Sequence, residues 1–156
     1  MAVAGLSTIG VKVGYALEAT AGTQPSAFTN LTRINAIGGI NLEPEQIDAS
    51  ALIDTITRYI AGRSDAGGTF PITVNLTPET ETEWETLISA YTGRGDEEKQ
   101  MWWVVYHPSL TKSFFIVAEP PANIPLPEVG QNELLTVEMN LTINEYKGML
   151  TAVNPS

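Results

Sequence analysis

Residues that could perform chemistry are few in this chain of 156 residues. It has no cysteine and a single histidine, His107, which disfavours thiolate chemistry, disulfides and histidine-based zinc or catalytic sites. Carboxylates do cluster, at Glu43 and Glu45 and at alternate positions from Glu79 to Glu85. We interpret the first pair as one face of a strand and the second set as the start of a helix, where the helix dipole stabilises acidic side chains. General acid catalysis would also need an apolar pocket that raises one carboxyl pKa, so the sequence favours a protein that is not an enzyme and holds no metal or cofactor.

The short motifs also favour structure over chemistry. No glycine-rich phosphate loop, HExxH zinc motif or GxSxG nucleophile motif occurs in the sequence. The Arg-Gly-Asp triplet at 94–96 is typical of a charged turn after a helix, and three Asn-Leu-Thr triplets reflect the preference of threonine for strands. The remaining enzyme hypothesis is a pair formed by Glu83 or Glu85 with His107.

The composition predicts one ordered domain that repels nucleic acid. Hydrophobic residues make up 43% of the chain and charged residues 17%, which is typical of a folded core over residues 1–156 and not of disorder. Eighteen acidic against eight basic residues give a net charge of −10, so tight binding to DNA is disfavoured. The sequence shows neither a signal peptide nor an apolar stretch of 18 residues, and we expect a protein that is made in the cytoplasm without a membrane anchor.

The start of the chain predicts an arm followed by a hairpin. Residues 1–28 keep neither helical nor strand periodicity for long, which predicts an extended N-terminal arm. Strand-like patterns at 31–37 and 40–47 flank the glycine pair 38–39, so we predict a hairpin with a tight turn at these glycines. Pro44 indicates that the second strand is an edge strand or carries a bulge.

The long segment 48–68 fits no simple element. Its apolar spacing suggests a helical turn or two, which glycines then end. Two interpretations stay open, a helix that caps the core and a loop that makes contacts between molecules. The apolar residues concerned are Leu52, Ile53, Ile56, Tyr59 and Ile60.

The second half of the chain has clearer patterns. Alternating apolar residues predict strands at 69–76 and 135–143, and two apolar runs at 101–106 and 113–118 predict a hairpin. We expect this hairpin to be buried on one side by a helix and on the other by a second sheet or a neighbouring subunit. The helix is predicted at about 78–92, with Thr77 as its N-cap, Pro78 in its first turn and Gly93 as its stop. The proline-rich stretch 119–132 predicts an irregular connection.

Together these elements predict a mainly β protein, an antiparallel β-sandwich or barrel with one flanking α-helix. Strands with exposed edges need protection, and closing a sheet across subunits into a ring provides it. The sequence therefore favours a building block that works through contacts with copies of itself.

The order of these elements resembles that of the major tail tube proteins of long-tailed (siphovirus-type) bacteriophages and prophages. The resemblance rests on the layout of nearly the whole chain, above all on IDASALIDTITRYIAGRSDAGG at 47–68 and LLTVEMNLTINEYKG at 134–148. It implies a β-sandwich-like subunit of six-membered rings that stack into a hollow tube, through which DNA enters the host cell. It also implies contacts with the tape measure, tail terminator and distal tail proteins, and a place in the tail of the virion.

The resemblance assigns two sets of site residues. The long loop 48–68 and the N-terminal arm would reach the adjacent ring, and the ring-to-ring contact candidates are Leu52, Ile53, Asp54, Ile56, Arg58, Tyr59, Arg63 and Asp65. An acidic lumen would let DNA slide without specific binding, and the lumen candidates are Asn41, Glu43, Glu45, Thr73, Asn75, Glu138, Asn140 and Thr142. The pattern does not decide which sheet faces the lumen.

Two alternatives stay open. The chain has features expected of another tail ring component, such as a tail-completion or distal tail protein, or of a secretion-type tube subunit with the same fold. A carbohydrate-binding β-sandwich would instead use Trp102, Trp103 and Tyr106 as exposed stacking platforms.

Overall fold

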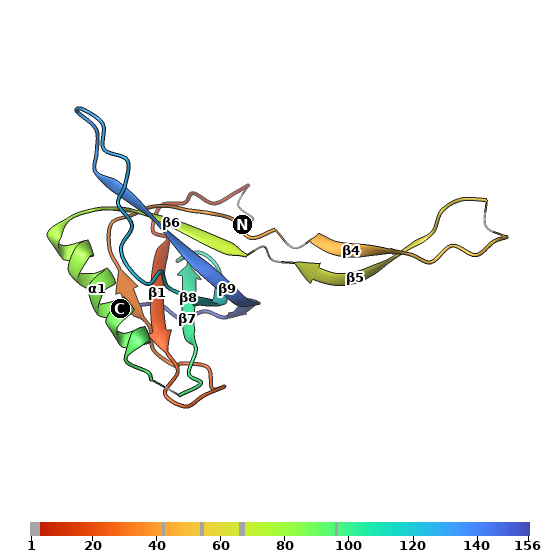
Figure 1. The fold of residues 1–156 in the computed structure, drawn as a ribbon, viewed down its shortest axis with the longest axis horizontal. Coiled ribbons are helices and arrows are strands. Elements are labelled where there is room, and N and C mark those ends of the chain that lie inside the picture. The colour runs from red at the N-terminus through yellow and green to blue at the C-terminus, as the bar shows by residue number, and fades with distance from the viewer. Residues whose placement is uncertain (1–3, 42, 54, 66–67, 96) are drawn as a thin grey trace.

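The computed structural model describes residues 4–41, 43–53, 55–65, 68–95 and 97–156, and the described chain is mainly antiparallel β-structure with one helix (Figure 1). This confirms the predicted fold class. The strands β2-β1-β7-β8-β9-β6-β3 form one sheet in this order, whereas β4 and β5 pair only with each other. The elements are β1 (Lys12–Leu17), β2 (Thr29–Leu31), β3 (Ile34–Ile37), β4 (Glu43–Asp48), β5 (Tyr59–Asp65), β6 (Thr69–Asn75), α1 (Pro78–Thr92), β7 (Met101–Tyr106), β8 (Lys112–Glu119) and β9 (Thr136–Thr151).

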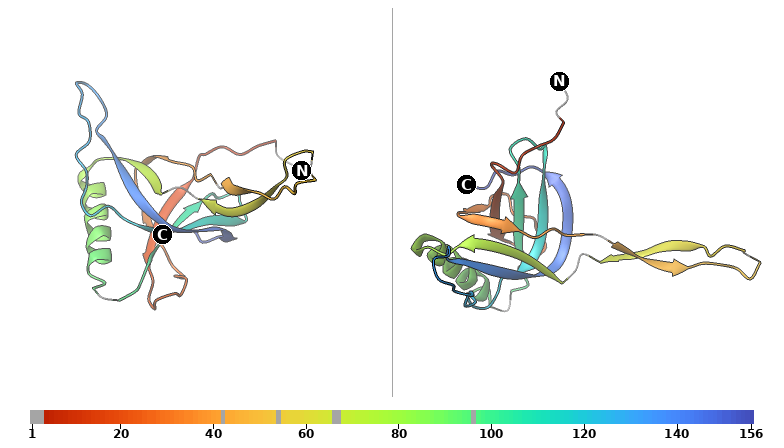
Figure 2. Two further views of the ribbon diagram at one scale, coloured as in Figure 1. Left: turned by 45° about the vertical axis from the view of Figure 1, so that its right-hand side comes forward. Right: turned by 90° about the horizontal axis from the view of Figure 1, so that it is seen from above.

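The long strand β9 lets the seven-stranded sheet form two layers. Its first half pairs with β6 from Thr136 to Thr142, and its second half pairs with β8 from Thr142 to Thr151. Two register shifts interrupt the β8–β9 ladder, and such irregularities let a strand bend from one layer into the next (Figure 2). One layer therefore contains β3, β6 and the first half of β9, and the other contains β2, β1, β7, β8 and the second half of β9.

The main core lies between these layers and α1. Alternate residues of β6 and β9 point into it, including Ile72, Val74 and Met139, all of them fully buried. The helix contributes Trp84, whose ring stacks on that of Trp103 from β7 with 5.8 Å between the ring centroids. This pairing confirms the prediction that the helix buries one side of the aromatic hairpin.

The opposite face of β7 and β8 is covered by the same chain. Trp102, Val104 and Phe115 pack there against Phe28, with residues of the C-terminal segment such as Val153 at the edge of the cluster. The prediction that a second sheet or a neighbouring subunit covers this side is therefore wrong. It failed because the covering residues come from a loop and a chain end that show no strand or helix periodicity.

The helix α1 begins and ends at the predicted residues. The Thr77 hydroxyl accepts a hydrogen bond from the Thr80 N–H, and the Thr80 hydroxyl accepts one from the Thr77 N–H, which completes a capping box. Further along the helix, the Glu83 carboxylate accepts hydrogen bonds of 2.9 Å from both the N–H and the hydroxyl of Thr32. This contact fixes the short connection between β2 and β3, which are the two edge strands of the sheet.

The predicted hairpin of 31–37 with 40–47 is wrong. β3 pairs with β6, and β4 pairs with β5. Gly38 lies against Pro71, where an added Cβ would come within 2.5 Å of the proline ring, and its N–H donates to the Pro71 carbonyl. The glycine is thus needed for a close approach between strands, not for a turn. The prediction for Pro44 is confirmed, because the β4–β5 register shifts directly after it.

The predicted N-terminal arm is too long. β1 begins at Lys12 and pairs along its whole length with β7, so it lies inside the sheet. Val13, Tyr15 and Leu17 contact the main core, and this alternation is a strand signal within the segment 1–28.

The helical interpretation of the segment 48–68 is wrong as well. Its second part forms the strand β5, and its apolar side chains are exposed, so they do not cap the core. The strand escaped prediction because YIAGRSD lacks the apolar alternation of a half-buried strand.

The buried Thr80 provides a test of how α1 is anchored. Its hydroxyl also donates to the Asn75 carbonyl at the end of β6, so Thr80→Ala removes a cap and leaves buried polar groups without a partner. We expect the free energy of unfolding to fall by about 1–2 kcal/mol in urea denaturation. Thr82→Ala, at an exposed position of the same helix, is the matched control, and equal losses for both variants would contradict this assignment.

Candidate functional site

The β4–β5 hairpin projects from the body of the protein (Figures 1 and 2). Its apolar side chains are exposed to solvent. The ladder runs from Glu43 opposite Asp65 to Asp48 opposite Tyr59 and holds the described part of the apex, residues 49–53 and 55–58, away from the sandwich. The side chains of Leu52, Ile53 and Ile56 are 106%, 89% and 77% exposed. Exposed apolar side chains on an extension of this kind are candidates for contact with another macromolecule.

The apex closes on itself through hydrogen bonds. The Asp48 carboxylate accepts from the Ser50 N–H at 2.9 Å, and these bonds to Ser50 hold the pKa of Asp48 below its usual value. The Ser50 hydroxyl accepts from the Arg58 N–H at 2.7 Å, and the Arg58 carbonyl accepts from the Ala49 N–H. The backbone at the base of the apex is thus ordered while its apolar side chains remain outside.

The ring-to-ring candidates fall into two groups. Leu52, Ile53, Ile56, Arg58 and Tyr59 are exposed at or beside the apex, and the structure brings them together on one extension. Asp54 lies outside the described residues, as do the side chains of Arg63 and Asp65, although the backbone of both belongs to β5. The proposed ion pairs of these residues therefore stay predictions.

Five lumen candidates share one polar face of the sandwich. β6 and β9 pair so that Thr73 lies opposite Glu138, and Asn75, Asn140 and Thr142 point to the same side. All five are exposed or half-buried, whereas the alternate residues of both strands are in the core. β3 extends this face, because the Asn35 amide donates to the Asn75 side chain at 3.0 Å. The paired portions of β6 and β9 contain no lysine or arginine, so the face is neutral to acidic.

The other lumen candidates lie elsewhere. Asn41 is exposed in the connection from β3 to β4, and the backbone of Glu43 and Glu45 belongs to β4 of the separate hairpin. Their side chains, apart from that of Asn41, lie outside the described residues. The structure therefore does not join these three positions to the polar face of β6 and β9.

An apolar groove lies between β3 and the facing residues of β1, β7 and β8. It consists of two hollows of about 480 and 210 Å³ that share the lining residues Ile37, Val105 and Phe114. Val13 and Ile34 line the larger hollow, and Phe70 and Tyr146 line the smaller one. This groove was not predictable from the sequence, because it forms where separate strands meet without filling the space between them.

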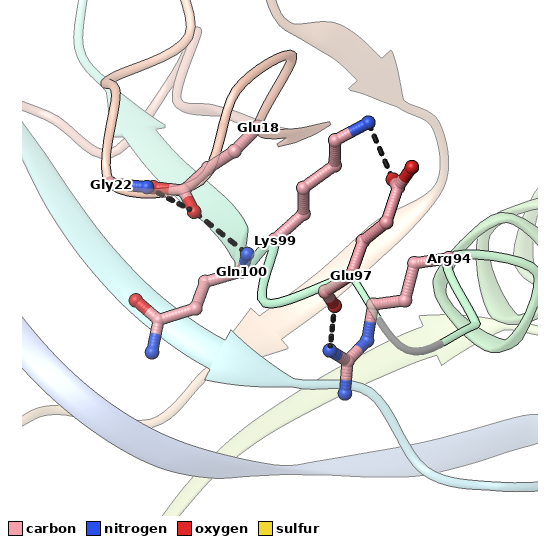
Figure 3. A network of polar contacts seen from close by, with 6 residues as sticks. All are labelled: Glu18, Gly22, Arg94, Glu97, Lys99 and Gln100. Carbon is pink, nitrogen blue, oxygen red and sulfur yellow. Dashed lines mark hydrogen bonds and ion pairs between the residues drawn. The ribbon is translucent and has the colours of Figure 1, made fainter.

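The buried carboxylate of Glu18 is a feature that the sequence did not reveal. Glu18, only 2% exposed, follows β1 and accepts hydrogen bonds from the N–H groups of Gly22 and Gln100 (Figure 3). It also accepts one from the Trp102 indole. Partial burial acts to raise the Glu18 pKa, but these hydrogen bonds and the nearby Lys147 together hold it below its usual value. The carboxylate ties the loop after β1 to the start of β7, which is a structural role.

The residues considered for carbohydrate binding and for catalysis make structural contacts instead. Trp102 and Trp103 are 5% and 0% exposed, so they offer no stacking platform for a carbohydrate. His107 lies with Nε2 2.6 Å from the Ser7 carbonyl, while Nδ1 accepts from the Ser109 N–H, and Glu83 binds Thr32. Within the described ranges, no three histidine or acidic side chains gather as metal ligands, and no helix has the length and apolarity to cross a membrane.

Comparison with known proteins identifies the fold. No protein-family model and no curated protein sequence matches this chain. Among solved structures, the chain is similar to one in the cryo-EM structure of the anti-feeding prophage baseplate, 6-fold symmetrised, with a TM-score of 0.54. The identity is 14%, and the match covers 97% of this chain and 98% of the other. Similarity at this identity shows a shared fold over the whole chain.

The depressed pKa of Glu18 predicts a pH-dependent contribution to stability. A carboxyl whose pKa is lower in the folded state stabilises the fold above its unfolded pKa, and this contribution disappears as the pH falls through the folded pKa. Glu18→Gln should therefore lower the free energy of unfolding by about 1–3 kcal/mol at pH 7, with a smaller difference from wild type below about pH 4. Urea denaturation across this pH range measures both.

The matched control for this experiment is Glu97→Gln. Glu97 is largely exposed and forms an ion pair with Lys99, so its loss should change the free energy of unfolding by less than about 1 kcal/mol (Figure 3). A Glu18→Gln effect that does not change with pH would show that the charge of Glu18 is not the stabilising feature.

Proposed function

We propose that this chain is a structural subunit of a phage-type tail, and more specifically that it forms the rings that stack into the tail tube. The observation that carries the proposal is the β4–β5 hairpin, which extends from a complete sandwich with its apolar apex exposed. A monomer would leave the apolar apex of this extension exposed to water, whereas a stacked assembly would bury it. The similar fold of a chain from a baseplate with sixfold symmetry supports the same class of assembly.

The apolar side chains would supply most of the stacking energy. Burial of a leucine or isoleucine side chain contributes about 1.5–3 kcal/mol, so Leu52, Ile53 and Ile56 together contribute about 5–9 kcal/mol before the cost of association. An exposed ion pair contributes about 0–1 kcal/mol. Six copies in a ring would multiply the apolar contribution, which makes a stack stable even when a single contact is weak.

The polar face of β6 and β9 is our candidate for the lumen. It combines uncharged threonine and asparagine side chains with Glu138 and, along these paired strands, carries no basic residue. Binding to DNA depends on lysine and arginine side chains that neutralise phosphates, so a face of this kind would let DNA pass without holding it. In this proposal the partners are other copies of the chain, the proteins that terminate the tube at its two ends, and the protein that fills the tube before DNA passes.

A second candidate function is a component that forms a single ring at an end of the tail. The baseplate origin of the similar structure favours it, because a baseplate contains rings that do not repeat along the tail. The two functions differ in copy number. A tube subunit should assemble into stacks of many rings, and a terminal component should stop at one ring.

The apex of the hairpin provides the first test. Changing Leu52, Ile53 and Ile56 together to serine should leave the fold intact, because all three side chains are exposed, and should reduce stacks to single rings or monomers. Negative-stain microscopy and analytical ultracentrifugation measure the outcome. The matched control changes Leu126, Val129 and Leu134 to serine, which removes the same kind of exposed side chain from another loop. Normal tubes from the apex variant would refute the stacking role.

The polar face provides the second test. Glu138→Lys combined with Asn140→Lys would place twelve lysines in each six-membered ring, so DNA ejection from assembled particles should slow by at least about tenfold, with recovery at high salt. Glu85→Lys with Thr82→Lys adds the same charge on the exposed side of α1 and serves as the control. Equal ejection rates for both variants would show that this face does not line the channel.

A further inference from the structure

The groove between β3 and the strands β1, β7 and β8 is apolar and nearly free of charge. Its larger hollow is lined by side chains such as Val13, Ile34, Val105, Leu110 and Phe114, and the only ionisable residue of its lining is His107. Both ring nitrogens of His107 are already engaged, with the Ser7 carbonyl and the Ser109 N–H. The uncharged polar residues of the lining are Thr8 and Asn35, and the Asn35 amide already donates to Asn75. The groove therefore suits an apolar group better than a carboxylate or ammonium, which would lose its hydration there.

The size of the groove suits a small number of aliphatic side chains. A cavity of about 150 Å³ holds a benzene molecule, so a hollow of about 480 Å³ has room for about three groups of that size. The hairpin apex carries three exposed side chains of this kind, Leu52, Ile53 and Ile56. Leu110 lies on the wall of the groove, is only half-buried and belongs to neither core cluster, so the hollow is open to a side chain that enters from outside.

Other exposed apolar segments fit the groove less well. The loop with Leu126 and Leu134 also carries Glu128 and Glu133, which would bring two carboxylates against an apolar surface. The N-terminal segment with Leu6 and Ile9 already forms part of the groove wall through its neighbours Thr8 and Val11. In the sequence of the apex, residues 49–58, the charged residues are Asp54 and Arg58, one of each sign.

The apex that enters the groove must come from another copy of the chain. The β4–β5 ladder carries each apex away from its own body, so it cannot fold back into its own groove without breaking that ladder (Figures 1 and 2). We infer that the apolar groove between β3 and β1, β7 and β8 is the acceptor site for the hairpin apex of a second copy in the adjacent ring. This inference rests on the proposed function and names the partner surface that the hairpin recognises.

A contact of this kind has a defined symmetry. The apex and the groove are different surfaces of one subunit, so every copy that donates an apex still offers an empty groove to the next. Such a heterologous contact does not close on itself in a pair, and it continues for as long as subunits or rings are added. The growth of a stack thus follows from one donor and one acceptor surface on the same chain.

Disulfide trapping tests the contact directly, because the chain has no cysteine of its own. We expect the double variant Leu52→Cys with Leu110→Cys to form disulfides between subunits when the assembled protein is oxidised, seen as a ladder of multimers on a non-reducing gel. Leu52→Cys with Ala90→Cys places the second thiol on the exposed side of α1 and should give no ladder. A ladder from the second pair and none from the first would overturn the inference.

A charge in the groove tests whether the contact drives stacking. Leu110→Glu should reduce the mean number of rings in a stack by at least about tenfold, because the carboxylate would have to be buried beside aliphatic side chains. The matched control Leu126→Glu makes the same change at an exposed leucine of another loop and should stack normally. If the serine variants of the apex lose stacking while Leu110→Glu keeps it, the groove is not the acceptor and the proposed function stands. If the wild-type chain forms no rings or stacks at any concentration, both proposals fail.

Discussion

The stacking of Trp84 on Trp103 is the contact on which the arrangement of the whole body depends. The chain has one helix to cover a sheet of seven strands, and this pair fixes the helix against β7 in the middle of the sheet order. One helix cannot cover the apolar side of so wide a sheet. The sheet therefore bends at β9 until its two parts cover each other, and Glu83 of the same helix holds the short connection between its edge strands β2 and β3.

Because the two parts of the bent sheet cover each other, the core is complete without the β4–β5 hairpin. None of the core residues in the described chain comes from β4, β5 or the apex, and the hairpin pairs only with itself. A pair of strands of this size is marginally stable in water by itself, so the apolar side chains on it are a cost to the isolated subunit. Their retention in an otherwise acidic chain is physically reasonable when another molecule covers them.

The sequence predicts the elements that follow local rules. Thr77, Pro78 and Gly93 mark both ends of α1, and the alternation from Val137 to Leu141 marks a strand with one buried face. The sequence predicts poorly those features that depend on tertiary contacts. Gly38 indicated a turn but serves a close approach to Pro71, and β5 has no buried face that could create a pattern. The polar faces of β6 and β9 were each predictable, whereas the groove and the Glu18 network depend on residues that are distant in sequence.

The separation of hairpin and core has a consequence for how such a chain can change over generations. Under the proposed function, substitutions at 49–53 and 55–57 would alter what the chain recognises and leave the folding of the sandwich almost untouched, since these side chains take no part in either core cluster. Recognition and foldability would then occupy different stretches of the same gene. A new pairing specificity can then arise by exchanging a few codons, without the loss of stability that changes in a packed interior bring.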